Sequence, residues 1–274
     1  MIVWLASYPK SGNTFVRSLL SSYIFSKDGN FNFELLKEIK QFPDNSLFKK
    51  LGVDIENEDE MYKNYINSQK LFYEKGSIRF LKTHSCFVNT NKFQFTDRHN
   101  TLGVIYIVRD PRNIVTSFSH HFQLQPEQAL ENLLSHRYLG QTSKDHCTTY
   151  IASWKYHFNS WKVFRRFNKY LLVRYEDLIN DTEKTFLQIL KFIAHLGRVK
   201  FTLDKEKFNN TLKTTGFDKM QKLEDKESFA EAKTDKKTGE KIKFFNMGIK
   251  NDWKKLLDKK IKENLEKELE NEMK

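Results

Sequence analysis

Four apolar runs that alternate with stretches of helical periodicity constrain the fold of this chain more than any other feature. The runs are IVWLAS, SIRFLKTH, LGVIYIVRDP and YLLVRYED. Short, nearly continuous apolar runs that end at turn residues are typical of strands buried on both faces. Strands that alternate with helices predict an α/β fold, in which a central, mostly parallel sheet is flanked by helices.

The stretches between these runs carry the spacing of amphipathic helices. After the first run Phe15, Leu19, Leu20, Tyr23 and Ile24 share one face, and after the third run Ile114, Val115, Phe118 and Phe122 do so. The fourth run follows an amphipathic stretch over 151–167 and precedes a predicted helix over 182–195. Helices therefore connect the predicted strands.

Length and composition narrow the class of protein. A chain of 274 residues fits one α/β domain, so we assign 1–274 to a single domain. Cys86 and Cys147 lie far apart and match no metal spacing, which favours a reducing compartment. The start MIVWLASYPK lacks the basic residues and the apolar length of a signal peptide, and no 18 apolar residues run together. We expect a cytoplasmic protein without a metal or a membrane span.

The net charge of +12 attracts anions without selecting among nucleotides, nucleic acids and acidic glycans. Much of it is Lys beside abundant Asn, Ile and Phe, a mixture that AT-rich coding DNA also produces. We therefore expect no nucleic-acid partner. A basic nucleic-acid-binding protein nevertheless stays among the alternatives at this point.

Two polar segments lie toward the C-terminus. Residues 218–243 are strongly polar and contain the turn signal DKKTG, which fits either a mobile lid or a solvated loop. Residues 254–273 place Leu257, Ile261, Leu265, Leu269 and Met273 four residues apart, which predicts a C-terminal amphipathic helix.

The loop after the first predicted strand, SYPKSGNTF, has the composition of an anion site. Amide groups at the start of a helix favour an anion by up to about 2 kcal/mol. Gly12 allows close approach, Ser11 and Thr14 add hydroxyl groups, and Lys10 adds a charge. A capped helix with a surface lysine is the structural alternative.

The loop lacks the GxxxxGK[ST] order of nucleotide triphosphatases, which also need a carboxylate for Mg²⁺. Asp110, Glu176 and Asp177 follow later strands, but each comes after an arginine, which suits an anion better than a cation. The site is thus predicted to hold phosphate without metal. A Mg-ATP-dependent, kinase-like P-loop enzyme remains the second alternative.

Six segments, in order from Tyr8 to Lys254, resemble the cytosolic and bacterial sulfotransferases. YPKSGNTF resembles their 5'-phosphosulfate loop YPKSGTTW, and VRDPRNIVTSFSHHF resembles their 3'-phosphate segment. LKTHS, VRYEDLINDTEKTFLQILKFI, TTGFDKM and FFNMGIKNDWKK match further family motifs. The resemblance implies the P-loop-kinase-like sulfotransferase fold and transfer of a sulfuryl group from 3'-phosphoadenosine 5'-phosphosulfate (PAPS) to an acceptor hydroxyl, an activity of the EC 2.8.2 type.

The resemblance also implies which residues bind the donor. The 5'-phosphosulfate would lie on the amides of Ser11, Gly12, Asn13 and Thr14. The residues implied for the 3'-phosphate and the adenine are Arg109, Ser117, Phe15, Tyr175, Thr215, Phe217 and Gly248. Phe15 stands where the family usually has a stacking Trp.

Three residues are implied in the transfer step. His84 matches the catalytic base, whose intrinsic pKa of about 6.5 suits proton removal from a hydroxyl group. Lys10 would neutralise charge on the leaving oxygen. Lys82, on the same strand face as His84, could hold the sulfonate oxygens.

The C-terminal motif departs from the family, because Asn246 and Met247 replace Arg and Lys before Gly248. Lys243 and Lys250 are the candidates to compensate near the 3'-phosphate. The family's dimer motif is not legible, so the oligomeric state stays open. We expect a small-molecule or glycan acceptor (sugar, lipid or metabolite), selected by residues 25–78 and 123–150.

Overall fold

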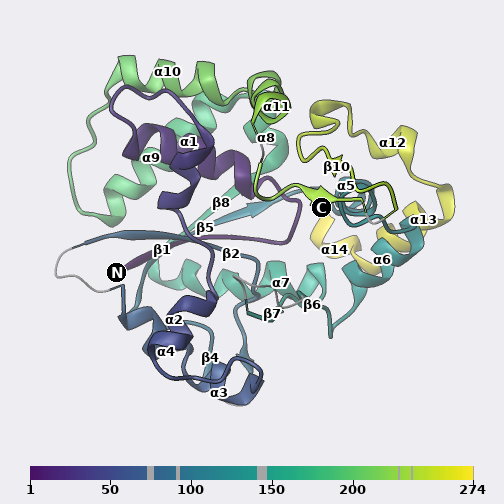
Figure 1. Ribbon diagram of the computed structural model, residues 1–274, viewed down its shortest axis with the longest axis horizontal. Coiled ribbons are helices and arrows are strands. Elements are labelled where there is room, and N and C mark those ends of the chain that lie inside the picture. The colour runs from purple at the N-terminus through teal and green to yellow at the C-terminus, as the bar shows by residue number, and fades with distance from the viewer. Residues whose placement is uncertain (73–76, 91–92, 141–146, 228, 236, 274) are drawn as a thin grey trace.

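The computed structural model describes residues 1–72, 77–90, 93–140, 147–227, 229–235 and 237–273. In it the four predicted strands form one parallel sheet with the order β2-β1-β5-β8 (Figure 1). These strands are β1 (Ile2–Ser7), β2 (Arg79–Thr83), β5 (Thr101–Val108) and β8 (Tyr170–Arg174). The predicted α/β class is confirmed.

The chain leaves β1 toward β2 on one side and returns to add β5 and β8 on the other. Connections therefore depart in opposite directions from the neighbouring strands β1 and β5. In open α/β sheets the carboxyl ends of two such strands border the ligand crevice. The topology thus places the loops after Ser7 and Val108 side by side.

Alternate residues of β1 enter different halves of the core. Val3 and Leu5 pack in one cluster with Leu19 of α1 and Phe186 of α9. Ile2, Trp4 and Ala6 belong to the cluster on the opposite face. This period of two, with every residue of β1 buried, is the pattern of a central strand covered on both faces.

Helices cover both faces of the sheet (Figure 1). One face carries α1 (Asn13–Phe25), α8 (Tyr175–Asn180), α9 (Thr182–Leu196) and α10 (Lys205–Thr215). The other cluster includes α2 (Asn45–Lys50), α3 (Glu58–Lys63), α4 (Tyr65–Lys70), α5 (Pro111–Phe122), α6 (Pro126–Leu134) and α7 (Trp154–Ser160). Short 3-10 helices span Phe33–Glu38, Trp161–Phe167 and Gly248–Lys250.

Helix α5 shows how local sequence fixes a helix start at the sheet edge. Pro111 occupies the first turn, where its missing N–H costs no helical bond. The Asp110 side chain caps the helix by accepting from the Arg112 N–H at 2.9 Å. Ile114 and Phe118 are buried, as the helical spacing predicts.

The polar segment 218–243 is not a simple solvated loop. Its first part lies in α11 (Phe217–Lys226), and buried Met220 and Phe229 pack with Phe245. Residues 228 and 236 lie outside the described part.

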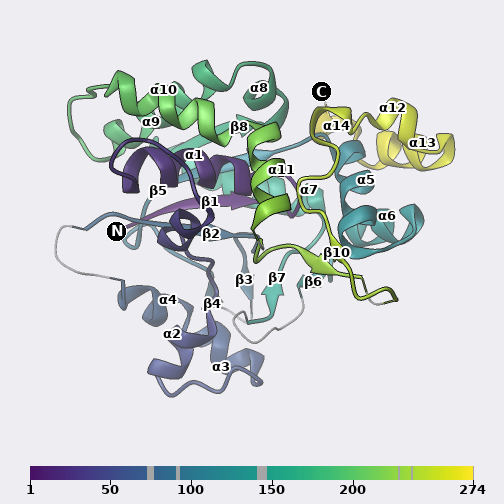
Figure 2. The same cartoon turned by 45° about the horizontal axis from the view of Figure 1, so that its top comes forward.

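Three pairs of short strands are antiparallel. They are β3 (Asn89–Thr90) with β4 (Phe93–Gln94), β6 (Leu139–Gly140) with β7 (Thr149–Tyr150), and β9 (Lys233–Thr234) with β10 (Lys241–Ile242). Figure 2 shows α11 and β10 in front of the sheet.

The expected single helix over 254–273 is wrong, because this stretch is broken. The structure has α12 (Trp253–Leu256), α13 (Lys259–Glu268) and α14 (Glu270–Met273). Leu257 leaves the helical conformation, and the Asp258 side chain then caps α13 by accepting from the Lys260 N–H at 2.7 Å. The apolar stripe still packs inward, since Ile261, Leu265 and Leu269 are buried.

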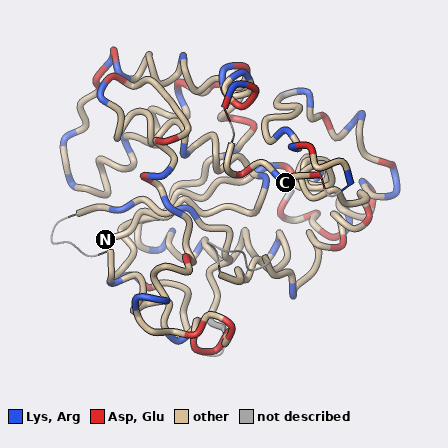
Figure 3. The backbone as a smooth tube through the Cα atoms, viewed as in Figure 1, with Lys and Arg blue, Asp and Glu red and all other residues tan. Residues whose placement is uncertain are grey.

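Charged residues are distributed along the whole chain. Figure 3 shows Lys and Arg interspersed with Asp and Glu. Within the described residues, no helix combines the length and the apolar composition that crossing a bilayer requires.

Candidate functional site

The loop between β1 and α1 is built as a cradle for an anion. Lys10 and Gly12 both adopt positive φ angles, 66° and 98°, which turn the chain sharply before the helix begins. The first amides of an α-helix have no carbonyl partner within it, and the helix dipole adds positive potential there. Ser11 Oγ is buried and has no hydrogen-bond partner among the described residues. The loop therefore offers donors that an anion could satisfy.

Tyr175, the first residue of α8, lies directly over Gly12. A Cβ atom at Gly12 would stand 2.4 Å from Tyr175 Cδ2, well inside van der Waals contact. The other partner of the ring is Arg109, whose guanidinium carbon lies 4.3 Å from the ring centroid. Arg109 also donates from Nη1 to the Lys10 carbonyl at 3.1 Å, which ties the end of β5 to the loop.

We expect Gly12→Ala to weaken binding of adenosine 3',5'-bisphosphate (PAP) sharply, because the new methyl group must displace the Tyr175 ring. Gly239→Ala is the matched control: Gly239 also has a positive φ, 75°, but no atom lies within 4 Å of its Cβ position. Both variants pay the backbone strain, of order 1 kcal/mol, and only the first meets the ring. Calorimetric titration with PAP checks the difference, and equal affinity in the two variants would contradict it.

His84 follows β2 at the edge of the cavity, and its ring orientation is fixed. Nδ1 lies 2.8 Å from the Ser7 carbonyl oxygen, an acceptor, so Nδ1 carries the proton. Nε2 is then the unprotonated nitrogen of the neutral ring. Burial, followed by the charge of Lys82, lowers the pKa of His84 to about 3. His84 is accordingly neutral at physiological pH, with Nε2 unprotonated.

Two lysines line the same cavity as this histidine. Burial is the main reason that the pKa of Lys10 falls to about 7; Glu231 opposes the fall, and Arg109 and Lys82 add to it. Lys10 Nζ stands 4.1 Å from the centroid of the Phe244 ring. Burial also lowers the pKa of Lys82, whose ammonium lies 3.2 Å from Glu231 Oε1. Both lysines thus sit where a bound anion would favour their charged forms.

One cavity of about 900 Å³ gathers nearly all of the residues predicted to form the site. Those that line it are Lys10, Gly12, Asn13, Thr14, Phe15, Lys82, His84, Arg109, Ser117, Tyr175, Thr215, Phe217 and Gly248. Ser11 lies buried behind the same loop. The structure therefore brings together side chains from positions 10 to 248 without assigning their roles.

Some of these side chains are turned away from the cavity or already hydrogen-bonded. Asn13 donates from Nδ2 to the Leu5 carbonyl at 2.9 Å and to Ser7 Oγ at 3.1 Å, so its side-chain amide is held against β1. The Thr215 hydroxyl donates to the Thr211 carbonyl at 2.7 Å.

The two lysines considered as compensation near Gly248 are not in the cavity lining. Lys243 Nζ pairs with Asp225 at 2.7 Å, and exposed Lys250 also lies outside the lining. Asn246 and Met247 do line the cavity. In the described residues, the replacement of the family's Arg and Lys is therefore not offset by either lysine.

The carboxylates after the strands have structural partners. Asp110 pairs with Arg112 at 2.8 Å, and Glu176 accepts from the Asp110 N–H at 2.9 Å. In the described part of the chain, no three His, Cys, Asp or Glu side chains gather in a way that could hold a metal ion.

Sequence reasoning missed two charged residues of the cavity, Glu231 and Lys233. Both come from the polar segment over 218–243. Their neighbours in the sequence carry no recognised motif, and they reach the site because Phe229 anchors the segment in the core. The sequence feature that could have indicated Glu231 is an acidic residue between apolar Phe229 and Ala232. Such a pattern is weak evidence for a site residue.

Comparison with known proteins adds independent findings. A family model described as the sulfotransferase domain matches residues 2–274. Flavonol 3-sulfotransferase of Flaveria bidentis is 24% identical over 97% of this chain and 79% of its own length. Human sulfotransferase 1E1 is 22% identical over 98% of this chain and 82% of its own.

Solved structures share the fold. Retinol dehydratase in complex with androsterone and the inactive cofactor PAP aligns with 100% of this chain and 80% of that chain, at 19% identity and a TM-score of 0.63. A mouse sulfotransferase complexed with PAP covers 100% and 84%, at 17% identity and a TM-score of 0.61.

Proposed function

Because the chain belongs to the sulfotransferase domain family, we propose that it transfers a sulfuryl group from PAPS to the hydroxyl group of a small acceptor. The observation that carries this proposal is a set of anion-binding groups without protein partners at the crevice between β1 and β5. Ser11 Oγ and Arg109 Nε are buried without a hydrogen-bond partner among the described residues. A ligand with two separated anionic groups would satisfy both.

The charged groups and the adenine of PAPS each have a matching group in the cavity under this proposal. The 5'-phosphosulfate would be held by the amides of Ser11 to Thr14 and by Lys10, at the N-terminus of α1. Its 3'-phosphate would be held by Arg109 and Ser117, since a guanidinium group can bind a phosphate through two N–H groups. Phe15 and Phe217 line the cavity and offer aromatic rings on which adenine could stack.

In the proposed transfer step, residues of the cavity accept the proton and offset the charge that the reaction produces. The acceptor oxygen forms a bond to sulfur while the bond between sulfur and the bridging phosphate oxygen breaks, and the electron pair of that bond stays on the phosphate. Lys10 offsets the charge that develops there. The proton of the acceptor hydroxyl passes to Nε2 of His84, the unprotonated ring nitrogen. Lys82 donates to the sulfonate oxygens.

The cavity has apolar side chains in its lining, which favour an acceptor with an apolar body. Phe118, Phe122, Leu124, Tyr138 and Ile151 line it. A flavonol, which the name of one relative specifies as its substrate, combines an apolar body with hydroxyl groups. We therefore place a lipid or an aromatic metabolite ahead of a sugar. Residues 73–76 and 141–146 of the predicted acceptor regions lie outside the described residues. The cytoplasmic location stays a prediction from the sequence.

Calorimetric titration tests the donor site. We expect PAP to bind, and adenosine 5'-monophosphate, which lacks the 3'-phosphate, to bind more weakly. Release of PAP from PAPS in the presence of hydroxylated apolar compounds then tests turnover. Undetectable PAP binding at millimolar concentration would overturn the proposed function.

A further inference from the structure

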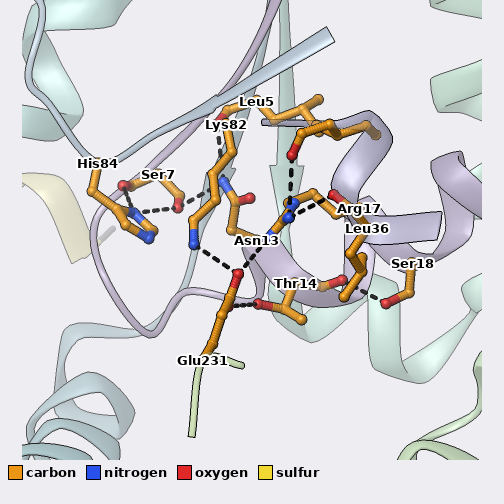
Figure 4. A network of polar contacts seen from close by, with 11 residues as sticks. Leu5, Ser7, Asn13, Thr14, Arg17, Ser18, Leu36, Lys82, His84 and Glu231 are labelled. Atoms are coloured by element: carbon orange, nitrogen blue, oxygen red, sulfur yellow. Dashed lines mark hydrogen bonds and ion pairs between the residues drawn. The ribbon is translucent and has the colours of Figure 1, made fainter. Parts of the chain in front are cut away.

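Segment 229–235 sends one carboxylate into the donor site. Figure 4 shows Glu231 pointing between α1 and β2. Its Oε2 accepts from Thr14 Oγ1 at 3.0 Å, and its Oε1 lies 2.5 Å from Arg17 Nη1 and 3.2 Å from Lys82 Nζ. Glu231 therefore joins the first two turns of α1 to β2, the strand that precedes His84.

The two cations of this cluster are buried. The side chains of Arg17 and Lys82 are 7% and 8% exposed. Arg17 is fixed further by donating from Nη2 to the carbonyls of Leu36 at 3.0 Å and Ile39 at 3.1 Å. Within the described part of the chain, Glu231 is the one acidic side chain that lines the cavity and the one side chain that accepts a hydrogen bond from Lys82 Nζ. Two buried cations thus share one carboxylate.

We propose that Glu231 is a positioning residue, which holds Lys82 in the cavity and keeps its ammonium group charged for the sulfonate of the donor. An ammonium group has three N–H donors, so two remain for sulfonate oxygens while the third is held by Glu231. The proposal rests on the proposed function, because it assigns Lys82 to the donor's sulfonate.

The charges around Lys82 explain why it needs this partner. Burial lowers the pKa of Lys82, and Arg17 lowers it further, whereas Glu231 raises it. Lys10 and His84 also face Lys82, since its charge lowers the pKa of each. Burial by itself raises the pKa of Glu231, but Lys82 and Arg17 outweigh this effect and hold that pKa well below its usual range. Without the carboxylate, every remaining influence favours neutral Lys82.

Glu231→Gln tests the proposal through the pH dependence of turnover. Lys82 is charged below its pKa and loses its charge as the pH rises through it. Loss of an adjacent opposite charge shifts a pKa by about 1 to 3 units. We therefore expect the alkaline limb of the kcat profile to move to lower pH by about that amount. Glu231→Asp, which keeps the charge, should retain most of the wild-type profile.

PAP lacks the sulfonate, so in Glu231→Gln its affinity should fall much less than turnover does. Glu231 also raises the pKa of Lys10, so the comparison is made below pH 7, where Lys10 is charged. Glu240→Gln, an exposed glutamate of the same region, is the control and should change neither quantity. An unshifted alkaline limb in Glu231→Gln would overturn the proposal. Tighter PAP binding with turnover retained would also overturn it, because Glu231 would then be a competitor of the donor.

A double-mutant cycle tests whether Glu231 acts through Lys82, with far-UV circular dichroism checking that each variant is folded. If Glu231 acts through Lys82, then Lys82→Gln and the double variant Lys82→Gln/Glu231→Gln should have the same kcat, since the charge that Glu231 supports is already absent. Additive losses would overturn the proposal. If the wild-type protein binds no PAP, the proposed function fails instead, so the two failures are distinguishable.

Discussion

Replacing His84 with alanine is expected to lower kcat by about 10²- to 10⁴-fold, the usual contribution of a general base, while PAP affinity stays near that of the wild type. The reason is that Nε2 is the unprotonated nitrogen, whereas Nδ1 donates to the Ser7 carbonyl. Steady-state turnover and calorimetric titration with PAP measure the two quantities. His195→Ala removes an exposed histidine of α9 and should leave both unchanged.

The same histidine predicts the acidic side of the pH profile. Because the pKa of His84 is lowered to about 3, its basic form is present above that pH and is lost only as the pH falls through it. Protonation of His84 should thus not reduce kcat between pH 5 and 7. Equal losses of turnover and PAP affinity in His84→Ala would instead identify a structural histidine.

Lys10→Met is expected to lower kcat by about 10²- to 10³-fold, the loss found when one group that stabilises a developing oxyanion is removed. It should also weaken PAP binding, since the 5'-phosphate loses a charged partner. Lys250→Met, which removes an exposed cation outside the cavity lining, is the control. Wild-type turnover in Lys10→Met would exclude this role.

Lys10 also predicts how PAP affinity depends on pH. With a pKa of about 7 in the free protein, Lys10 is charged below pH 7 and loses its charge above it. A PAP phosphate, with a second pKa of about 6, is already ionised in that range. The dissociation constant should therefore rise between pH 7 and 9, by at most about tenfold per unit, and this rise should be absent from Lys10→Met. A pH-independent dissociation constant in the wild type would contradict it.

The sheet was predictable because its inner strands, β1 and β5, are buried on both faces. Runs such as IVWLAS have no polar face to place in solvent, and the helical spacing after them leaves few other architectures. The order β2-β1-β5-β8 was not predicted, because pairing depends on contacts between residues far apart in the chain. Leu257 ends a helix inside an apolar stripe of period four, so the stripe concealed the break before Asp258.

The candidate site also contains residues that the sequence could predict and residues that it could not. Lys10, His84 and Arg109 follow strands of the sheet, so their meeting at one edge could be expected from the sequence. Glu231 reaches Thr14 across 217 positions of sequence, from a segment whose composition is that of a surface loop. The Asn13 side chain bonds to the Leu5 carbonyl, whereas the prediction concerned only its backbone amide. Such orientations depend on packing that no motif encodes.

Ser7 is the last residue of β1, and its carbonyl orients the proposed base, while Lys10 begins the anion cradle three residues later. The position of the base relative to the donor is thus determined largely by a short covalent connection at the end of the most buried strand. Sequence changes in the acceptor-facing helices and loops can alter which molecule enters the cavity without altering that connection. A chain built in this way can change its acceptor in evolution, or in the laboratory, while the spacing between base and donor is inherited intact.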